Sequence, residues 1–75
     1  FNPSTVIRYQ LPEAAQVSLE VFDMAGRKVA DLVNGQVSAG SHSVNFDASQ
    51  LSSGVYMYRL QTGSTTLTRK LTVVK

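Results

Sequence analysis

The stretch QVSLEVFD, residues 16–23, alternates apolar and polar side chains along most of its length. In an extended chain, Val17, Leu19 and Val21 fall on one face, whereas the polar side chains between them fall on the other. Phe22 departs from the alternation, and we expect it to cover an edge of a sheet. A period of two residues is typical of a strand with one buried face, so this stretch predicts a β-strand in a layered fold.

Short runs of the same kind continue on both sides of this stretch, separated by turn signals. The runs are STVIRYQL (4–11), RKVADLVNG (27–35), SHSVNFD (41–47), GVYMYRL (54–60) and the terminal segment 65–75. The turn signals are LPEAAQ (11–16), DMAG (23–26), NG (34–35), SAGS (38–41), DASQLSSG (47–54) and TGST (62–65). This spacing predicts an all-β fold, an Ig-like antiparallel β-sandwich of about seven short strands in a single domain over residues 1–75.

The run at 27–35 fits two periods. Val29, Leu32 and Val33 follow helical spacing, whereas Val29, Asp31 and Val33 follow strand spacing. We favour a bulged strand over a helical turn, because the segment is short and its neighbours are strands.

Two later runs also depart from simple alternation. The run at 54–60 is apolar on both faces, which predicts a central strand that is buried on both sides. In the last run, Leu67, Leu71 and Val73 share one face, but Arg69 interrupts it. We therefore expect a bulge or an edge position at Arg69.

The alternation also predicts the core and the turns. Predicted core residues are Ile7, Tyr9, Val17, Leu19, Val21, Val29, Val44, Phe46, Tyr56, Tyr58, Leu60, Leu71 and Val73. Asp23 and Asp47 each end a strand, where an Asp side chain accepts hydrogen bonds from backbone N–H groups two residues further on.

Composition narrows the function classes. The chain has 75 residues, a mass of 8.1 kDa and a formal net charge of +2. The basic residues are scattered, which argues against nucleic-acid binding. Cysteine is absent, and no apolar run approaches the ~20 residues of a membrane span. The chain begins with Phe1 and shows no signal peptide, so we expect a fragment or a processed piece of a longer protein.

Few residues offer catalytic or ligand-binding chemistry. His42 is the single histidine, and it alternates with Ser41 and Ser43 in a solvent-facing pattern that makes a triad base a remote possibility. The carboxylates form no calcium-loop pattern. Tyr9, Tyr56 and Tyr58 are the candidates for a sugar-stacking platform, but the absence of Trp favours core packing. We therefore expect no enzyme activity, no cofactor and no metal.

Three stretches together resemble a known family. They are FNPSTVIRYQLPEAAQVSLEVFDMAGRKVADLV, SAGSHSVNFDASQLSSGVYMYRLQTG and the terminal TRKLTVVK. In this order and spacing, the chain resembles the type A C-terminal sorting domain of the type IX secretion system (Por secretion). The Ig-like module of flagellar hook-capping proteins is similar in VFDMAGRKV, AGSHSVNFD and GVYMYRL, but the stop at Lys75 favours the sorting domain.

The resemblance implies a function and partners. Such domains are non-catalytic sorting signals at the C-terminus of exported proteins of Bacteroidetes-type bacteria. It implies an N-terminal cargo domain, a hydrolase in many cases, that crosses the periplasm and becomes secreted or cell-surface. It also implies recognition by the type IX machinery, an outer-membrane translocon and a sorting protease, with no nucleic acid and no membrane span.

The resemblance also implies which residues matter. The family motif corresponds to Gly54 and Tyr56, and the recognition element to the last strand or two, roughly residues 65–75. The expected recognition residues are Lys70, Leu71, Val73, Val74 and Lys75. The alternatives are a structural Ig-like module, either of the hook-cap type or a spacer beside a catalytic domain, and a small carbohydrate-binding sandwich.

Overall fold

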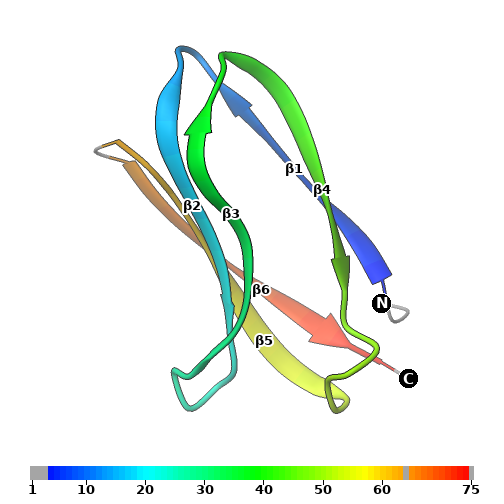
Figure 1. Cartoon of the computed structure of the whole chain (residues 1–75). Coiled ribbons are helices and arrows are strands. Elements are labelled where there is room, and N and C mark those ends of the chain that lie inside the picture. The colour runs from blue at the N-terminus through cyan, green and yellow to red at the C-terminus, as the bar shows by residue number, and fades with distance from the viewer. Residues whose placement is uncertain (1–3, 64, 75) are drawn as a thin grey trace.

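The computed structural model describes residues 4–63 and 65–74, and these form β-strands without a helix (Figure 1). The six strands are β1 (Ser4–Leu11), β2 (Ala15–Phe22), β3 (Lys28–Val37), β4 (Gly40–Asp47), β5 (Gly54–Thr62) and β6 (Thr65–Val73). The all-β prediction is confirmed, with six strands rather than about seven. In the described part of the chain, no helix is long and apolar enough to cross a membrane.

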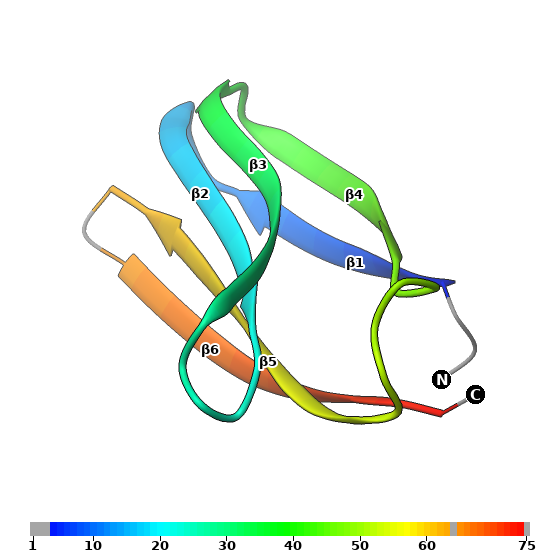
Figure 2. The same ribbon diagram turned by 60° about the horizontal axis from the view of Figure 1, so that its bottom comes forward.

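The strands form two antiparallel sheets that share one core. β1 and β4 make a two-stranded sheet, and the order β3-β2-β5-β6 makes a four-stranded sheet. The hairpins β2–β3 and β5–β6 stay within the larger sheet, whereas the other connections pass between the sheets. Figure 2 shows the two layers and places the start of β1 and the end of β6 at the same end of the molecule.

The core lies between the inner faces of the two sheets. On β2, the side chains of Val17, Leu19 and Val21 are 0% exposed, as the alternation predicts. Burying each such side chain stabilises the fold by about 1.5–3 kcal/mol. The other buried apolar residues are Ile7, Leu11, Phe46, Ala48, Tyr56, Leu60 and Val73. The remaining predicted core residues, Tyr9, Val29, Val44, Tyr58 and Leu71, are half-buried against this cluster.

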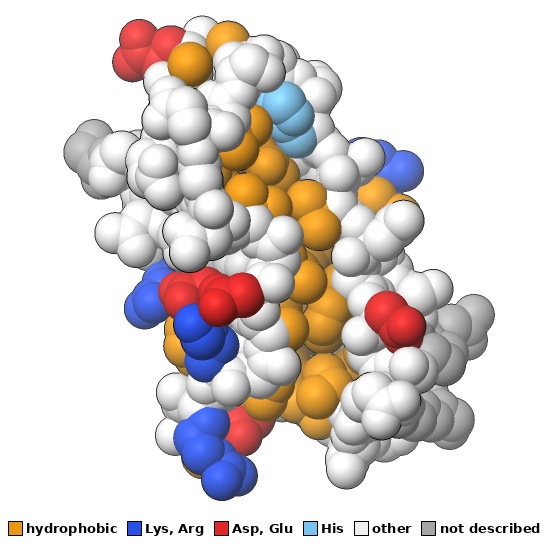
Figure 3. All heavy atoms as spheres, in the orientation of Figure 1, with side chains coloured by type: hydrophobic (Ala, Val, Ile, Leu, Met, Phe, Trp, Pro, Cys, Tyr) orange, Lys and Arg blue, Asp and Glu red, His pale blue; other side chains and the backbone are white. Residues whose placement is uncertain are grey.

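The sandwich is open along one flank. The smaller sheet has only two strands, so it covers the larger sheet incompletely. Figure 3 shows a band of apolar side chains along the gap between β3 and β4. The loop between β4 and β5 contributes Ala48 and Leu51 to the core, which the strand alternation did not predict because neither residue lies on a strand.

β3 is a bulged strand, as predicted. Its pairing with β2 shifts register twice, because Leu32 and Val29 have no partner of their own on β2. The expected turn at Asn34 and Gly35 is wrong. Both residues lie inside β3, where they pair with β2, so the two sides of this NG sequence do not form a hairpin with each other.

β5 is an interior strand, but it is not buried on both faces. Its inner face carries Tyr56, which is 8% exposed, whereas Val55 on the outer face is 36% exposed. A two-layer domain covers only one face of each sheet, so an apolar run on both faces of β5 indicates its interior position rather than double burial.

The Asp turns form as predicted. Asp23 Oδ1 accepts hydrogen bonds from the backbone N–H groups of Ala25 at 2.9 Å and Arg27 at 3.0 Å. Asp47 Oδ1 accepts one from the N–H of Ser49 at 2.9 Å. The hydrogen bond from the Arg27 N–H, with that from Ala25, holds the pKa of Asp23 below its ordinary value. These bonds fix the chain reversal that begins β3 and the loop that follows β4.

Candidate functional site

β6 is an edge strand of the four-stranded sheet. It pairs with β5 alone, from Gly54 opposite Val73 to Thr62 opposite Thr65, without a register shift. The sequence prediction of an edge position at Arg69 is confirmed, and the bulge offered as its alternative does not occur. In an antiparallel ladder, alternate residues direct their N–H and C=O groups away from the existing partner, so the exposed part of β6, Thr65 to Lys70, presents backbone groups for pairing.

The two ends of β6 differ in burial. All side chains from Thr65 to Lys70 are exposed, on both faces of the sheet, including Leu67 at 41%. The other end is anchored, because Leu71 is half-buried and Val73 is 1% exposed. The strand is therefore attached to the core at its end and projects along the sheet edge at its beginning.

The predicted recognition residues fall into these two groups. Lys70 and Val74 are accessible, and Val74 is 58% exposed. Leu71 and Val73 face the core, so the folded domain covers much or all of their side chains. Lys75 lies outside the described residues.

The motif residues Gly54 and Tyr56 support the anchored end of β6. Gly54 pairs with Val73, and Tyr56 pairs with Leu71. The Tyr56 hydroxyl donates a hydrogen bond of 2.8 Å to the carbonyl oxygen of Ser52, four residues upstream. This arrangement is similar to the tyrosine corner of Ig-like sandwiches. It ties the loop before β5 to the strand that holds β6.

The cations of the domain divide into two sets. Arg59 Nη2 lies 2.9 Å from Glu20 Oε1, Lys28 Nζ lies 2.8 Å from Asp31 Oδ2 and 3.4 Å from Glu20 Oε2, and Arg27 Nε lies 3.3 Å from an Asp23 oxygen. By contrast, Arg8, Arg69 and Lys70 form no ion pair within residues 4–63 and 65–74.

Of the paired set, Arg59 and Lys28 lie on the outer face of the larger sheet, whereas Arg27 lies in the turn between β2 and β3. The hydrogen bond from Arg59 holds the pKa of Glu20 below its ordinary value, and the hydrogen bond to Asp31 raises the pKa of Lys28. The Arg59 guanidinium also lies 4.9 Å from the centre of the Phe22 ring, so Phe22 lies under this cation rather than at an edge of the sheet. Sequence analysis missed this network, because alternation places Glu20 on the polar face without showing that β2 pairs with β5.

The prediction that His42 faces solvent is wrong, because its side chain is half-buried. It shares the inner face of β4 with Val44 and Phe46, and its ring stacks on Tyr9 with 5.4 Å between the ring centres. Its Nε2 lies 2.8 Å from the carbonyl oxygen of Ser38. The expectation was wrong because it followed the flanking serines, whereas the two-residue period places His42 on the same face as Val44 and Phe46.

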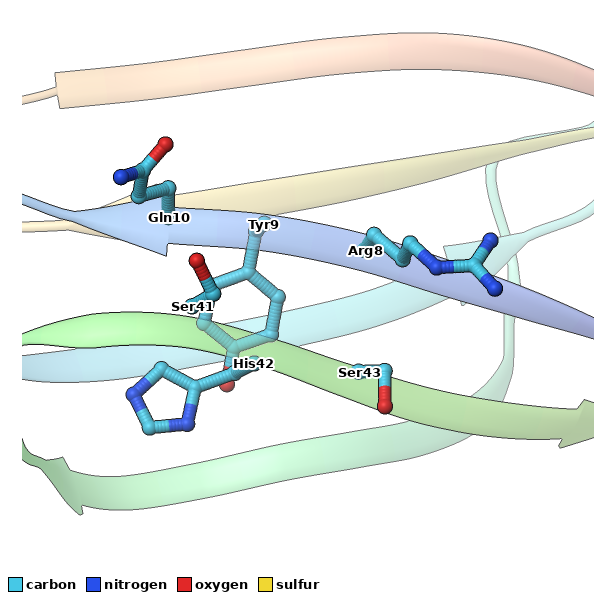
Figure 4. A pocket seen from close by; sticks show the side chains of 6 residues that line it. All are labelled: Arg8, Tyr9, Gln10, Ser41, His42 and Ser43. Atoms are coloured by element: carbon cyan, nitrogen blue, oxygen red, sulfur yellow. The ribbon is translucent and has the colours of Figure 1, made fainter.

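Residues of β1 and β4, Tyr9 and His42 among them, line a hollow at the end of the smaller sheet (Figure 4). Its lining residues are Arg8, Tyr9, Gln10, Ser41, His42 and Ser43, and none of them is a carboxylate that could orient the imidazole. In the described part of the chain, no group of three His, Cys, Asp or Glu side chains could hold a metal ion. The geometry offers packing and stacking at this place rather than a nucleophile with its base.

The three tyrosines make no exposed platform. Tyr56 is buried, and Tyr9 and Tyr58 pack half-buried against the core cluster. A carbohydrate-binding surface needs aromatic faces that are open to solvent, so this arrangement removes the observation on which that alternative depended.

Comparison with known protein families matches residues 2–74 to the secretion system C-terminal sorting domain. No curated protein and no solved structure matches the chain. Domains of this family are non-catalytic sorting signals for type IX secretion, which agrees with the resemblance carried by the three stretches. Because the match spans nearly all of its residues, the chain belongs to the family of type IX secretion C-terminal sorting domains.

Proposed function

We propose that this domain directs an attached cargo through the periplasm and across the outer membrane, and that the type IX machinery recognises it at β6. The family match over residues 2–74 supports this proposal most strongly. The straight, exposed edge of β6, with its unpaired cations Arg69 and Lys70, supplies a physical basis for recognition.

Recognition at such an edge would proceed by strand addition. A receptor strand that pairs with β6 gains affinity from main-chain hydrogen bonds and specificity from alternate side chains. Lys70 and Val74 are accessible for side-chain contacts, whereas Leu71 and Val73 hold the strand in place. Lys70 and Lys75 would steer the domain toward an acidic receptor groove.

The proposed partners follow from the family. They are the outer-membrane translocon, the sorting protease and an N-terminal cargo domain of the hydrolase type. The cargo would become secreted or attached to the cell surface after passage through the periplasm, and the domain would be removed by cleavage.

The test is an export assay. Residues 1–75 are fused to the C-terminus of a fluorescent protein that carries a cleavable export signal, and the fusion is expressed in a type IX-competent bacterium. We expect fluorescence outside the cell for the full fusion and periplasmic retention for a version that lacks residues 68–75. Retention of both fusions would favour a structural Ig-like module instead.

A second pair of variants separates recognition from folding. The truncation also removes the core residue Val73, so it reports on both properties. Lys70→Glu with Lys75→Glu changes charge at the proposed signal alone, and we expect it to abolish export. The matched control is Arg8→Glu with Arg27→Glu, which makes the same change in net charge away from β6. Export by the lysine variant at the control's level would refute the role of these lysines.

A further inference from the structure

The exposed part of the β6 edge, from Thr65 to Lys70, has a backbone that is suited to pairing with another strand. The strand is 9 residues long, has a regular register with β5 and is exposed from Thr65 to Lys70. Edge strands of this kind associate unless bulges, prolines or charges prevent it. β6 contains no proline and no bulge, so charge is the remaining one of these features that can prevent association.

Two consecutive cations occupy the middle of this edge. Arg69 is the midpoint of Thr65–Val73 and lies opposite Tyr58, on the inner face of the sheet. Lys70 lies opposite Met57, on the outer face. Consecutive residues of a strand point to opposite faces. If another strand paired with β6, each face of the extended sheet would therefore carry one of these cations beside the new strand.

The position of these cations opposes symmetric self-pairing. Two copies related by a twofold axis would pair their β6 strands antiparallel. In full register, the midpoint residue Arg69 would lie directly opposite Arg69 of the second copy. A slip of two residues in one direction would place Lys70 opposite Lys70 of the second copy. A slip of two residues in the other direction would shorten the ladder and place the two copies of Arg69 diagonally across from each other. Like charges at these positions destabilise a strand pair.

The same cations favour a partner of opposite charge. Three of the domain's other cations, Arg27, Lys28 and Arg59, already lie against carboxylates of this chain. Arg69 and Lys70 have no such partner within the described residues, and β6 itself contains no Asp or Glu. A carboxylate on an incoming strand would therefore meet a cation that is not yet neutralised.

We propose that the edge of β6 rejects a second copy of this chain and accepts an extended strand that carries carboxylates at two consecutive positions, with Arg69 as the specificity-determining residue beside Lys70. That the protein supplying this strand is a secretion receptor rests on the proposed function. The rule of pairing is a property of the domain alone, so it can be tested without export.

The first experiment measures self-association of the purified chain by sedimentation velocity at low ionic strength. We expect the natural sequence to remain monomeric and Arg69→Thr with Lys70→Thr to form a concentration-dependent dimer. The control is Arg8→Thr with Arg27→Thr, which removes the same charge elsewhere and is expected to remain monomeric. A dimer of the natural sequence, or equal dimerisation of the control, would overturn the proposal.

The second experiment swaps the charge. Arg69→Glu with Lys70→Glu is expected to be monomeric alone, because its carboxylates would oppose each other. Mixed with the natural sequence, it is expected to form a heterodimer with a dissociation constant about tenfold or more below that of either homodimer, and added salt should weaken it. Amide shifts in isotope-labelled natural chain should map to β6. A mixture that stays monomeric, or shifts that map to β1 or β4, would refute the proposal.

Discussion

The two edges of the four-stranded sheet, β3 and β6, are built differently. β3 changes register twice against β2, and its cation Lys28 lies against both Asp31 and Glu20. β6 keeps one register along its whole length, and Arg69 and Lys70 have no ion-pair partner among the described residues. One sheet therefore has one irregular, internally neutralised edge and one straight, charged edge.

This difference shows how a small sandwich can direct association to one side. Bulges twist an edge strand and interrupt its row of backbone groups, which discourages pairing there. A straight edge keeps that row available and leaves selection to its side chains. In the proposed function, the straight edge is the surface with which a partner strand would pair.

The largest expected effect tests the anchoring of β6. Val73→Ala removes buried methyl groups worth about 0.8 kcal/mol each and leaves a cavity, so we expect a loss of about 2–3 kcal/mol in the free energy of unfolding. Val33→Ala on β3 is the matched control, and it should lose less free energy of unfolding because Val33 is only half-buried. Urea denaturation measures both, and equal losses would contradict a tighter anchor on β6.

A second comparison concerns the glycines next to the two edges. Gly63, in the β5–β6 turn, has φ +52°, whereas Gly35 inside β3 does not have a positive φ. Among the described residues other than the chain neighbours, no atom lies within 4 Å of a Cβ added at either position. Gly63→Ala should therefore cost about 1–2 kcal/mol through backbone strain alone. Gly35→Ala should be neutral or slightly stabilising in the same thermal unfolding measurement, and the reverse order would refute this account.

A smaller effect is expected from the hydroxyl that ties the loop before β5. Tyr56→Phe removes the hydrogen bond to Ser52 and should lower the free energy of unfolding by about 0.5–1.5 kcal/mol. Tyr58→Phe is the control, because no such bond is found for Tyr58 among the described residues. If both variants lose the same stability, the bond to Ser52 does not stabilise this loop.

The smallest effect tests the neutralised edge through pH. The pKa of Glu20 is lowered in the folded domain by the hydrogen bond from Arg59. A lowered pKa stabilises the fold above the ordinary glutamate value of about 4.3, and this contribution disappears as the pH falls through that value to the folded pKa. Glu20→Gln should therefore lose less stability in acid than the natural sequence does, and an equal loss in both would contradict this contribution of Glu20. Unfolding curves between about pH 3 and pH 7 decide the matter.

Prediction from sequence succeeded where a pattern depends on near neighbours in the chain. The alternation at Val17, Leu19 and Val21 predicts their burial, and the Asp turns follow from contacts within a few residues. It failed where the outcome depends on strands far apart in the chain. The stacking of Tyr9 on His42 depends on the pairing of β1 with β4, and the local sequence around His42 contains no sign of this neighbour.

The candidate site shows the same division. The sequence marks residues 65–75 as important through their resemblance to a family, and it places Arg69 out of pattern. It does not show which of these residues a partner can reach. Val73 and Lys70 are both among the expected recognition residues, yet Val73 is buried and Lys70 is exposed.

The sequence by itself determined the fold class, the positions of the strands and the family, because side-chain period, turn chemistry and motif spacing are local properties of the chain. The sequence also favoured a bulge in β3 and left either a bulge or an edge position open at Arg69. Tertiary structure alone decided that β6 is an edge strand without a register shift, and that Glu20 neutralises Arg59 and Lys28. The physical reason is that strand order and register are set by the joint burial of inner faces from both sheets. The charges left without partners on β6 follow from that arrangement.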